Sequence, residues 1–392
     1  MLETGVNRRG VSRVAPSKRL RVAFLGGAYE SAVGRVHRIA VEMDQRFELV
    51  AGCFSRNADI NTASAARYGV HPDRVYGSLE NLLEHETGKM DAILILTPTD
   101  QHASQIVDCL EAGVPVICEK ALVASVNQAV EVREKILSGR GFLAVTYNYT
   151  GYPMLRELKM MVDSGRFGKI QQIHLEMPQE GFARLGPDGT ALTPQEWRLH
   201  DGLIPTLSLD LGVHLHNIVF FLTGQRPMEL VSTSESYGNF RQIIDNVSCL
   251  AKYSGNIHCS FWYGKTALGT RNGLKVRVYG EKGSAEWLQE DSECLRVADN
   301  LGGRMILDRG GGGLKIANQV RYTRFKAGHP SGFIEAFANY YFDVADALEV
   351  YKGGSAAGSQ SYVFGIDAAL EGLRMLEAIA KSFVEKRWVK FE

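Results

Sequence analysis

Residues 21–34 read R-V-A-F-L-G-G-A-Y-E-S-A-V-G, and this stretch decides the fold. An apolar strand that ends at Leu25 runs directly into Gly26 and Gly27, and an amphipathic helix begins after Gly34. Glycines let a backbone approach a pyrophosphate without a Cβ clash, and a helix N-terminus offers unpaired N–H groups to the anion. The stretch therefore predicts a turn that can bind the phosphates of a nucleotide.

The spacing of these glycines is irregular. Ala28 stands where the G-x-G-x-x-G fingerprint has its second glycine, and three additional residues precede Gly34. Since a lone glycine motif is a weak signal, a tight turn without a ligand is the alternative interpretation.

Residues 21–146 alternate short apolar runs with amphipathic segments, which is the pattern of parallel strands joined by crossover helices. The predicted strands are 21–25, 47–54, 92–97, 114–118 and 142–145, and the predicted helices are 35–43, 58–68, 101–111 and 126–138. This order predicts a doubly wound α/β domain, in which ligands bind at the carboxyl ends of the strands.

Residues 147–392 have a different pattern. One predicted helix, 154–164, precedes stretches of alternating apolar and polar residues at 170–176, 229–235, 247–253, 257–263 and 274–279. Alternation predicts a sheet that is covered on one side, and the uncovered side is expected to pack against another subunit in a homo-oligomer. Residues 333–348 and 366–383 are predicted helices. Four glycines within 309–314 favour a flexible loop, with a mobile substrate lid as the alternative.

The composition bounds the class of protein. A chain of 392 residues predicts two domains, and 44 basic residues against 44 acidic ones give no reason to expect nucleic acid or a membrane surface as partner. Six cysteines without a C-x-x-C pair predict reduced thiols, no structural zinc and a cytoplasmic location. The basic residues 1–20 predict a flexible extension, with a transit peptide as the alternative.

Strand ends supply further candidate site residues. Ser55 and Arg56 follow the second strand, where a carboxylate would bind the ribose in an NAD-specific protein. Because these two residues could receive a 2′-phosphate instead, they favour NADP over NAD; a solvated arginine is the alternative. Thr97-Pro98 and Glu119-Lys120 fall at the ligand-binding edge of the sheet.

Several motifs, taken in order, resemble one family. They are the glycine turn from Gly26 to Gly34, Thr97-Pro98-x-x-x-His102, Glu119-Lys120, Asn148-Tyr149, Trp197-Arg198, Asp210-Leu211-Gly212-Val213-His214, Gly328-His329-Pro330 and Glu335-Ala336-Phe337-Ala338-Asn339. In this order they resemble the Gfo/Idh/MocA family of glucose-fructose oxidoreductase, inositol dehydrogenase and rhizopine catabolism proteins. The resemblance covers nearly all of the chain from Arg21.

The resemblance implies a Rossmann domain at 21–146 and a second α/β domain at 147–392 with a large open, mainly antiparallel sheet that forms dimers or tetramers. It implies hydride transfer between NAD(P) and a secondary alcohol or ketone of a sugar, sugar acid or inositol, with no metal. The implied cofactor contacts are Gly26, Gly27, Ser31, Ser55, Arg56, Thr97, Pro98, His102, Glu119, Lys120, Asn148, Trp197 and Arg198. The implied substrate contacts are Lys120, Tyr149, Asn217 and His329.

The implied catalytic residues are Lys120 beside the reacting oxygen, His214 as acid/base and Asp210 as its orienting partner. Oxidation of an alcohol requires a base within reach of the hydroxyl, and histidine suits this task near neutral pH. Asp210 and His214 are four residues apart, so on a helix they share one face. Asp210 as a helix cap is the alternative.

Ala121 departs from the family, which has proline after this lysine. A cis peptide costs about 2.5–4 kcal/mol before alanine, against about 0.5–1 kcal/mol before proline. A trans bond would redirect Lys120 and leave open a regulatory protein without catalysis; NAD-assisted glycoside hydrolysis is a third possibility. Arg184, Arg198 and Arg324 would suit an anionic group on the substrate, or solvent.

Overall fold

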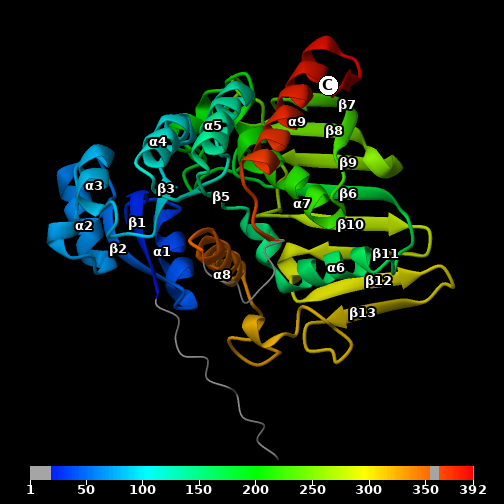
Figure 1. Ribbon diagram of the computed structural model, residues 1–392. Coiled ribbons are helices and arrows are strands. Elements are labelled where there is room, and N and C mark those ends of the chain that lie inside the picture. The colour runs from blue at the N-terminus through cyan, green and yellow to red at the C-terminus, as the bar shows by residue number, and fades with distance from the viewer. Residues whose placement is uncertain (1–18, 354–361, 392) are drawn as a thin grey trace, which may run out of the picture.

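The computed structural model describes residues 19–353 and 362–391 (Figure 1). Most of the extension predicted for residues 1–20 lies outside the described residues, and the first strand begins at Leu20. The structure has two α/β parts, each built on its own sheet, as the sequence predicts.

The N-terminal part is a parallel sheet of five strands in the order β2-β1-β3-β4-β5. Its strands are β1 (Leu20–Gly26), β2 (Phe47–Cys53), β3 (Ala92–Leu96), β4 (Val116–Cys118) and β5 (Leu143–Val145). Its helices are α1 (Gly34–Met43), α2 (Ala58–Tyr68), α3 (Leu79–Glu86), α4 (Thr99–Glu111) and α5 (Val126–Gly139). The predicted elements are confirmed within a few residues, and only α3 was missed, a short helix capped by Ser78.

The second part contains a nine-stranded sheet in the order β13-β12-β11-β10-β6-β9-β8-β7-β14. Its strands are β6 (Ile170–Pro178), β7 (Pro227–Glu235), β8 (Asn246–Tyr253), β9 (Ile257–Gly264), β10 (Lys275–Gly280), β11 (Gly283–Leu288), β12 (Cys294–Asp299), β13 (Arg304–Asp308) and β14 (Val389–Lys390). Only β6 and β9 pair in parallel, so the predicted mainly antiparallel sheet is confirmed.

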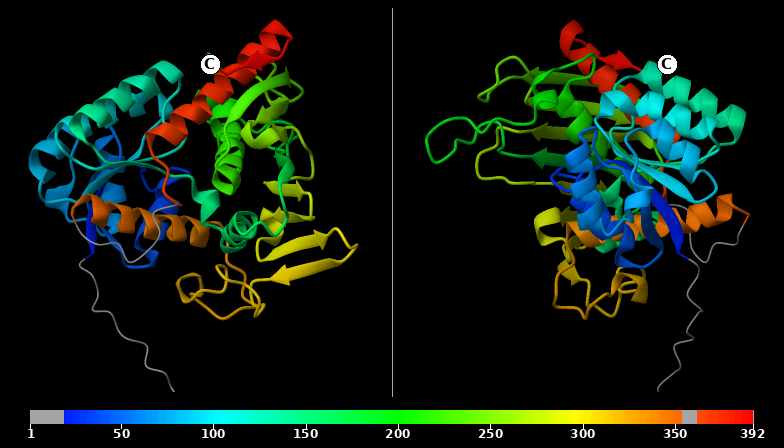
Figure 2. Two further views of the ribbon diagram at one scale, coloured as in Figure 1. Left: turned by 45° about the vertical axis from the view of Figure 1, so that its right-hand side comes forward. Right: turned by 90° about the vertical axis from the view of Figure 1, so that its left-hand side faces the viewer.

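Helices cover one face of this sheet. They are α6 (Pro153–Asp163), α7 (Val213–Thr223) and α9 (Ile366–Glu385), which pack on β11 and β12, on β6, and on β7, respectively. The helix α8 (Phe333–Tyr351) instead packs on α1 of the first part and on the short helix η2 (Asn148–Gly151), so it joins the two parts (Figure 2). No helix among the described residues is long and apolar enough to cross a membrane.

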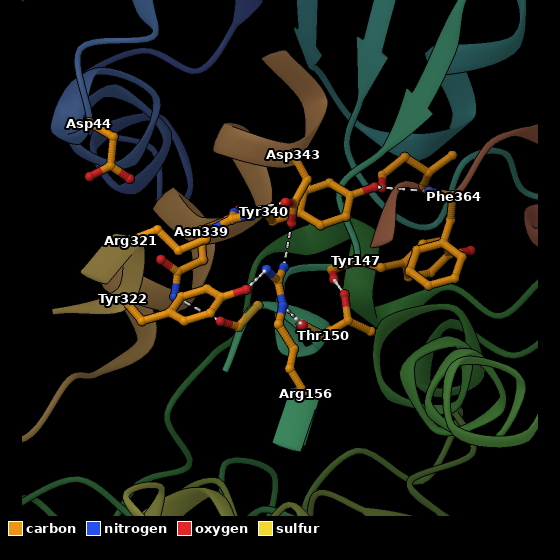
Figure 3. A network of polar contacts seen from close by, with 12 residues as sticks. Asp44, Tyr147, Thr150, Arg156, Arg321, Tyr322, Asn339, Tyr340, Asp343 and Phe364 are labelled. Carbon is orange, nitrogen blue, oxygen red and sulfur yellow. Dashed lines mark hydrogen bonds and ion pairs between the residues drawn. The ribbon is translucent and has the colours of Figure 1, made fainter. Parts of the chain in front are cut away.

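A sealed polar network fixes α8 to α6 (Figure 3). Arg156 donates from Nε to the carbonyl of Thr150 at 2.7 Å, from Nη1 to the hydroxyl of Tyr322 at 2.8 Å and from Nη2 to Asp343 at 2.5 Å. Asp343 also accepts from Arg321 at 2.7 Å, and the side chains of Arg156 and Asp343 are fully buried. Each of the three nitrogens of the Arg156 guanidinium therefore has a protein acceptor, and α8 is held in place.

The glycine-rich stretch is tied down at both ends. Arg309 donates from Nε to Glu293 at 2.5 Å. Beyond the glycines, the backbone N–H groups of residues 315–317 donate to the carboxylate of Glu157 at 2.7–3.1 Å. The segment is therefore held at its start by Glu293 and after the glycines by Glu157 on α6, two contacts that the glycines alone could not indicate.

Candidate active site

A cavity of about 510 Å³ lies between the two parts of the molecule. The first part supplies the turn before α1 and the ends of β3 and β4, and the second supplies η2, α7, the end of β9 and the start of α8. The lining includes Ser31, His37, Thr97, Pro98, Glu119, Lys120, Asn148, Tyr149, Trp197, Arg198, Asp210, His214 and Lys265. The carboxyl edge of the parallel sheet therefore opens into this cavity, as such sheets require.

The glycine turn packs closely against its neighbours beside the cavity, although Gly26 and Gly27 do not line it. Gly26 and Gly27 have φ of +80° and +69°, and a Cβ on Gly26 would lie 2.9 Å from the backbone of Leu96. A Cβ on Gly34 would lie 2.1 Å from the carbonyl oxygen of Gly27, so only glycine lets α1 begin this close to the strand. Gly34 N–H donates to Ser31 Oγ at 2.9 Å. The irregular spacing thus still places a helix N-terminus beside the turn.

Asn148 supplies a second sign of a missing polar ligand. It lines the cavity and is 3% exposed, and its Nδ2 has no acceptor among the described residues. A buried donor without an acceptor costs free energy, so a ligand that brings an acceptor would be stabilised here. The glycine turn and this donor both fit a dinucleotide.

Asp210 lies in a π-helical turn, Ser208–Gly212, directly before α7, and it binds three cations. Lys120 Nζ donates to Oδ1 and to the backbone carbonyl of Asp210, both at 2.9 Å. Lys265 Nζ donates to Oδ2 at 2.5 Å, and Arg198 Nη1 donates to the same oxygen. Burial opposes the charge, but Lys120 and the other cations hold the pKa of Asp210 well below its usual range.

His214 faces the cavity from the first turn of α7, with its ring edge-to-face to Tyr149 at 4.6 Å. Neither ring nitrogen has a hydrogen bond within residues 19–353 and 362–391, and Asp210 binds the lysines rather than this imidazole. Burial and the nearby Lys120 ammonium lower the pKa of His214 to about 3. The imidazole is therefore neutral, with both ring nitrogens free to meet a ligand in the cavity, while Asp210 holds Lys120.

The peptide bond between Lys120 and Ala121 is cis, which answers the question raised by the missing proline. His102 lies behind this peptide: its Nδ1 is 3.0 Å from the carbonyl oxygen of Leu122, and its Nε2 is 2.8 Å from that of Thr97. His102 does not line the cavity, so it supports the loop that carries Lys120 rather than touching a ligand there.

Glu119 is the other carboxylate of the site. It accepts from the N–H of Lys120 at 3.1 Å and from the hydroxyl of Thr146, and its Oε1 lies 3.1 Å from His37 Nε2. Burial opposes the charge, but His37 and Lys120 lower the pKa of this carboxyl. The His37 Nδ1 contacts the hydroxyl of Tyr341 on α8 at 2.5 Å, which links the site to the helix that joins both parts.

Some predicted site residues lie elsewhere. Ser55 and Arg56 follow β2 beside the glycine turn, outside this cavity. Asn217 is buried within α7 and does not line the cavity, and His329 lies in an exposed loop against Phe325. The structure therefore brings neither Asn217 nor His329 to the place where the substrate was expected.

Sequence reasoning missed His37 and Lys265. The position of His37, three residues after Gly34 on the helix that follows the glycine turn, is a signal that could have found it. No local pattern marks Lys265, which simply follows β9. No group of three or more potential metal ligands occurs in the part of the chain that the structure describes.

Comparisons with known proteins identify the family of the chain. Family models match at residues 20–146 for the oxidoreductase family, NAD-binding Rossmann fold, and at residues 155–286 for the GFO/IDH/MocA C-terminal domain. An oxidoreductase structure from Sinorhizobium meliloti is 30% identical, with a TM-score of 0.82 and coverage of 95% of this chain and 100% of the other.

Two further relatives cover almost the whole chain. An inositol dehydrogenase homolog from Azotobacter vinelandii, solved with NADH and myo-inositol, is 28% identical, with a TM-score of 0.86 and coverage of 96% and 98%. The uncharacterized oxidoreductase YfiI of Bacillus subtilis (strain 168) is 28% identical over 389 residues, 96% of this chain and 98% of that protein.

The Rossmann sheet and the family matches over both parts of the chain thus define an NAD-binding oxidoreductase. The chain belongs to the Gfo/Idh/MocA family, which confirms the resemblance carried by its motifs.

Proposed function

We propose that the protein is a dehydrogenase or reductase that transfers a hydride between a nicotinamide dinucleotide and a secondary alcohol or ketone of a sugar, sugar acid or inositol-like compound. One observation carries this proposal: Lys120 and a neutral His214 line the same cavity at the carboxyl edge of the Rossmann sheet. Nicotinamide supplies or accepts the hydride when it is bound.

The side chains account for the proton that accompanies the hydride. The Lys120 ammonium, held by Asp210, is placed to donate to the substrate oxygen and stabilise a developing alkoxide. The neutral imidazole of His214 is placed to accept the hydroxyl proton during oxidation and to return it during reduction. Tyr149, packed against His214, closes one side of the cavity.

The test combines binding and turnover. NADH or NADPH is titrated into the purified protein by fluorescence, and sugar acids, aldoses and inositols are then screened with the oxidised and reduced cofactors. In His214→Ala we expect turnover to fall by roughly 10²- to 10⁴-fold with little change in dinucleotide affinity. Unchanged turnover would remove His214 from the mechanism, and dinucleotide binding without turnover would favour a regulatory protein or a glycoside hydrolase.

The choice between NAD and NADP rests on Ser55 and Arg56. We propose a preference for NADP because no carboxylate stands at the end of β2 and the arginine is exposed beside the glycine turn. The Azotobacter vinelandii relative was solved with NADH, and the proposed preference rests on these two residues. Arg56→Asp should weaken NADPH relative to NADH by about tenfold or more; an unchanged ratio would retire the preference.

We also propose a homodimer or homotetramer formed through the uncovered face of the large sheet. Leu250 on β8 and Trp262 on β9 are 55% and 36% exposed on that sheet. Exposed apolar groups on an open sheet favour association. Light scattering after size-exclusion chromatography should give a multiple of the chain mass, and Leu250→Lys should reduce it.

A further inference from the structure

The cavity holds more positive charge than its own carboxylates can neutralise. Lys120, Arg198 and Lys265 line it, together with Glu119 and Asp210. Among the lysine, arginine and carboxylate side chains of the lining, three cations stand against two carboxylates, which leaves a surplus of one positive charge.

Lys265 is the most unusual of these cations because a buried lysine is rare. It is 6% exposed, and burial lowers its pKa while Asp210 opposes that shift. Its ammonium also lies 5.1 Å from the centre of the Phe182 ring. Burying a lysine is costly, so a position like this needs partners for the charge.

Asp210 has too few carboxylate oxygens to accept from every N–H donor of the three cations. It offers two carboxylate oxygens, of which Lys120 takes one while Lys265 and Arg198 share the other. An ammonium and a guanidinium each carry several N–H donors. Within the described residues, Asp210 is the one hydrogen-bond acceptor of the Lys265 ammonium and of the Arg198 guanidinium. Donors therefore remain on both groups, in a cavity where a ligand can reach them.

The other two arginines that the sequence suggests for an anionic group of the substrate lie outside the cavity. Arg184 is paired with Glu180, and Arg324 with Asp44 and Asn339, and neither lines the cavity. Only Arg198 of the three faces the site.

We propose that Lys265 and Arg198 form a subsite for the carboxylate of an acidic polyhydroxy substrate, such as an aldonic or uronic acid, beside the hydroxyl that meets Lys120. A single surplus charge matches a carboxylate better than a phosphate monoester, which carries about −1.5 to −2 at pH 7. The two sets of cations sit on different oxygens of Asp210, so one substrate could meet both. The inference rests on the proposed dehydrogenase function.

The experiment compares matched substrates. Gluconate and galacturonate are assayed against glucose and galactose with the preferred dinucleotide, and kcat/KM is determined for each. We expect the acids to be preferred by at least tenfold, with the difference mainly in KM. In Lys265→Met that preference should fall by about 10- to 100-fold, and Lys265→Arg should retain most of it.

Lys252→Met is the matched control, because Lys252 is an exposed lysine on β8 that pairs with Glu229 and does not line the cavity. Its acid preference should equal that of the wild type. Arg198→Gln provides a second route if Lys265→Met does not fold, and it should also reduce the preference.

Binding separates the two proposals. Gluconate is titrated by calorimetry into the complex of the protein with NADH or NADPH. Tighter binding to wild type than to Lys265→Met without any turnover would support the subsite and overturn the dehydrogenase. Turnover with equal kcat/KM for acids and neutral sugars, or with a preference for sugar phosphates, would overturn the carboxylate subsite and leave the dehydrogenase standing.

Discussion

Two clusters, each with several cations around its own aspartate, differ in burial: one is enclosed by protein and the other lines a cavity. Around Asp343, the side chains of Arg156 and of the aspartate are fully buried, and Arg321 pairs with the same carboxylate from a partly exposed position (Figure 3). Around Asp210, two lysines and Arg198 line a cavity and keep donors to spare. The same chemistry is a structural tie where each guanidinium nitrogen of Arg156 has a protein acceptor, and a candidate binding site where donors line an accessible cavity.

The largest effect should come from the sealed cluster. Asp343→Ala leaves the Arg156 guanidinium buried without its carboxylate, which costs about 3–5 kcal/mol of unfolding free energy. Urea titration measures the loss. Formate added to the variant should restore nothing, because the network is closed to solvent. A loss below about 1 kcal/mol would show that the enclosure is not tight.

Asp210→Ala makes the same substitution in the open cluster. We expect turnover to fall by roughly 10²- to 10³-fold, because Lys120 loses its anchor, while the unfolding free energy falls by less than in Asp343→Ala. Formate at high concentration should recover part of the turnover, since it can enter the cavity and replace the carboxylate. Equal stability losses in the two variants, or no rescue by formate, would remove the distinction between the clusters.

Asp91 is a further buried carboxylate, and its substitution should give the smallest loss of unfolding free energy because its partners are partly exposed. It is 8% exposed, and it accepts from the backbone N–H of Arg21 at 2.7 Å and from the side chains of Arg21 and Lys352, both partly exposed. Burial opposes its charge, but these donors lower the pKa of Asp91 from 3.8 to about 2. Asp91→Asn should therefore cost about 1–2 kcal/mol at pH 7.

The pH dependence checks the sign of this effect. A lowered carboxyl pKa stabilises the fold fully above the unfolded value of 3.8, and that stabilisation is lost as the pH falls towards 2. The difference in unfolding free energy between wild type and Asp91→Asn should thus be constant from pH 7 to about 5 and shrink below 4. A difference that persists at pH 2 would mean that packing rather than charge is responsible.

The first part of the fold could be predicted almost residue by residue. Strands buried on both faces read as apolar runs, and helix α2 has the same bounds in prediction and structure. The second sheet was predicted less completely: β11, β12 and β13 were missed, because they are short and partly exposed and their apolar pattern is weak. The two-residue strand β14 gives no pattern to detect.

The residues of the candidate site also differ in how well the sequence predicted them. Lys120, Asp210 and His214 belong to motifs that can be compared with a family, and the structure brings all three into one cavity. Lys265 belongs to no motif, and its role depends on β9 ending beside the turn that holds Asp210. Asn217 and His329 were carried over from motifs in the same manner, but α7 and the exposed loop direct them elsewhere.

The sequence by itself determined what depends on neighbours along the chain: the apolar periodicity of each strand and helix, and the glycines that the turn at Gly26 and Gly27 requires. Only the tertiary structure decided which charges meet. Lys120, Arg198 and Lys265 converge on Asp210 from positions up to 90 residues away, and Arg156 meets Asp343 across 187 residues. Local patterns set backbone conformation, whereas charge pairing depends on how whole elements pack, so satisfied and unsatisfied clusters look alike until the chain is folded.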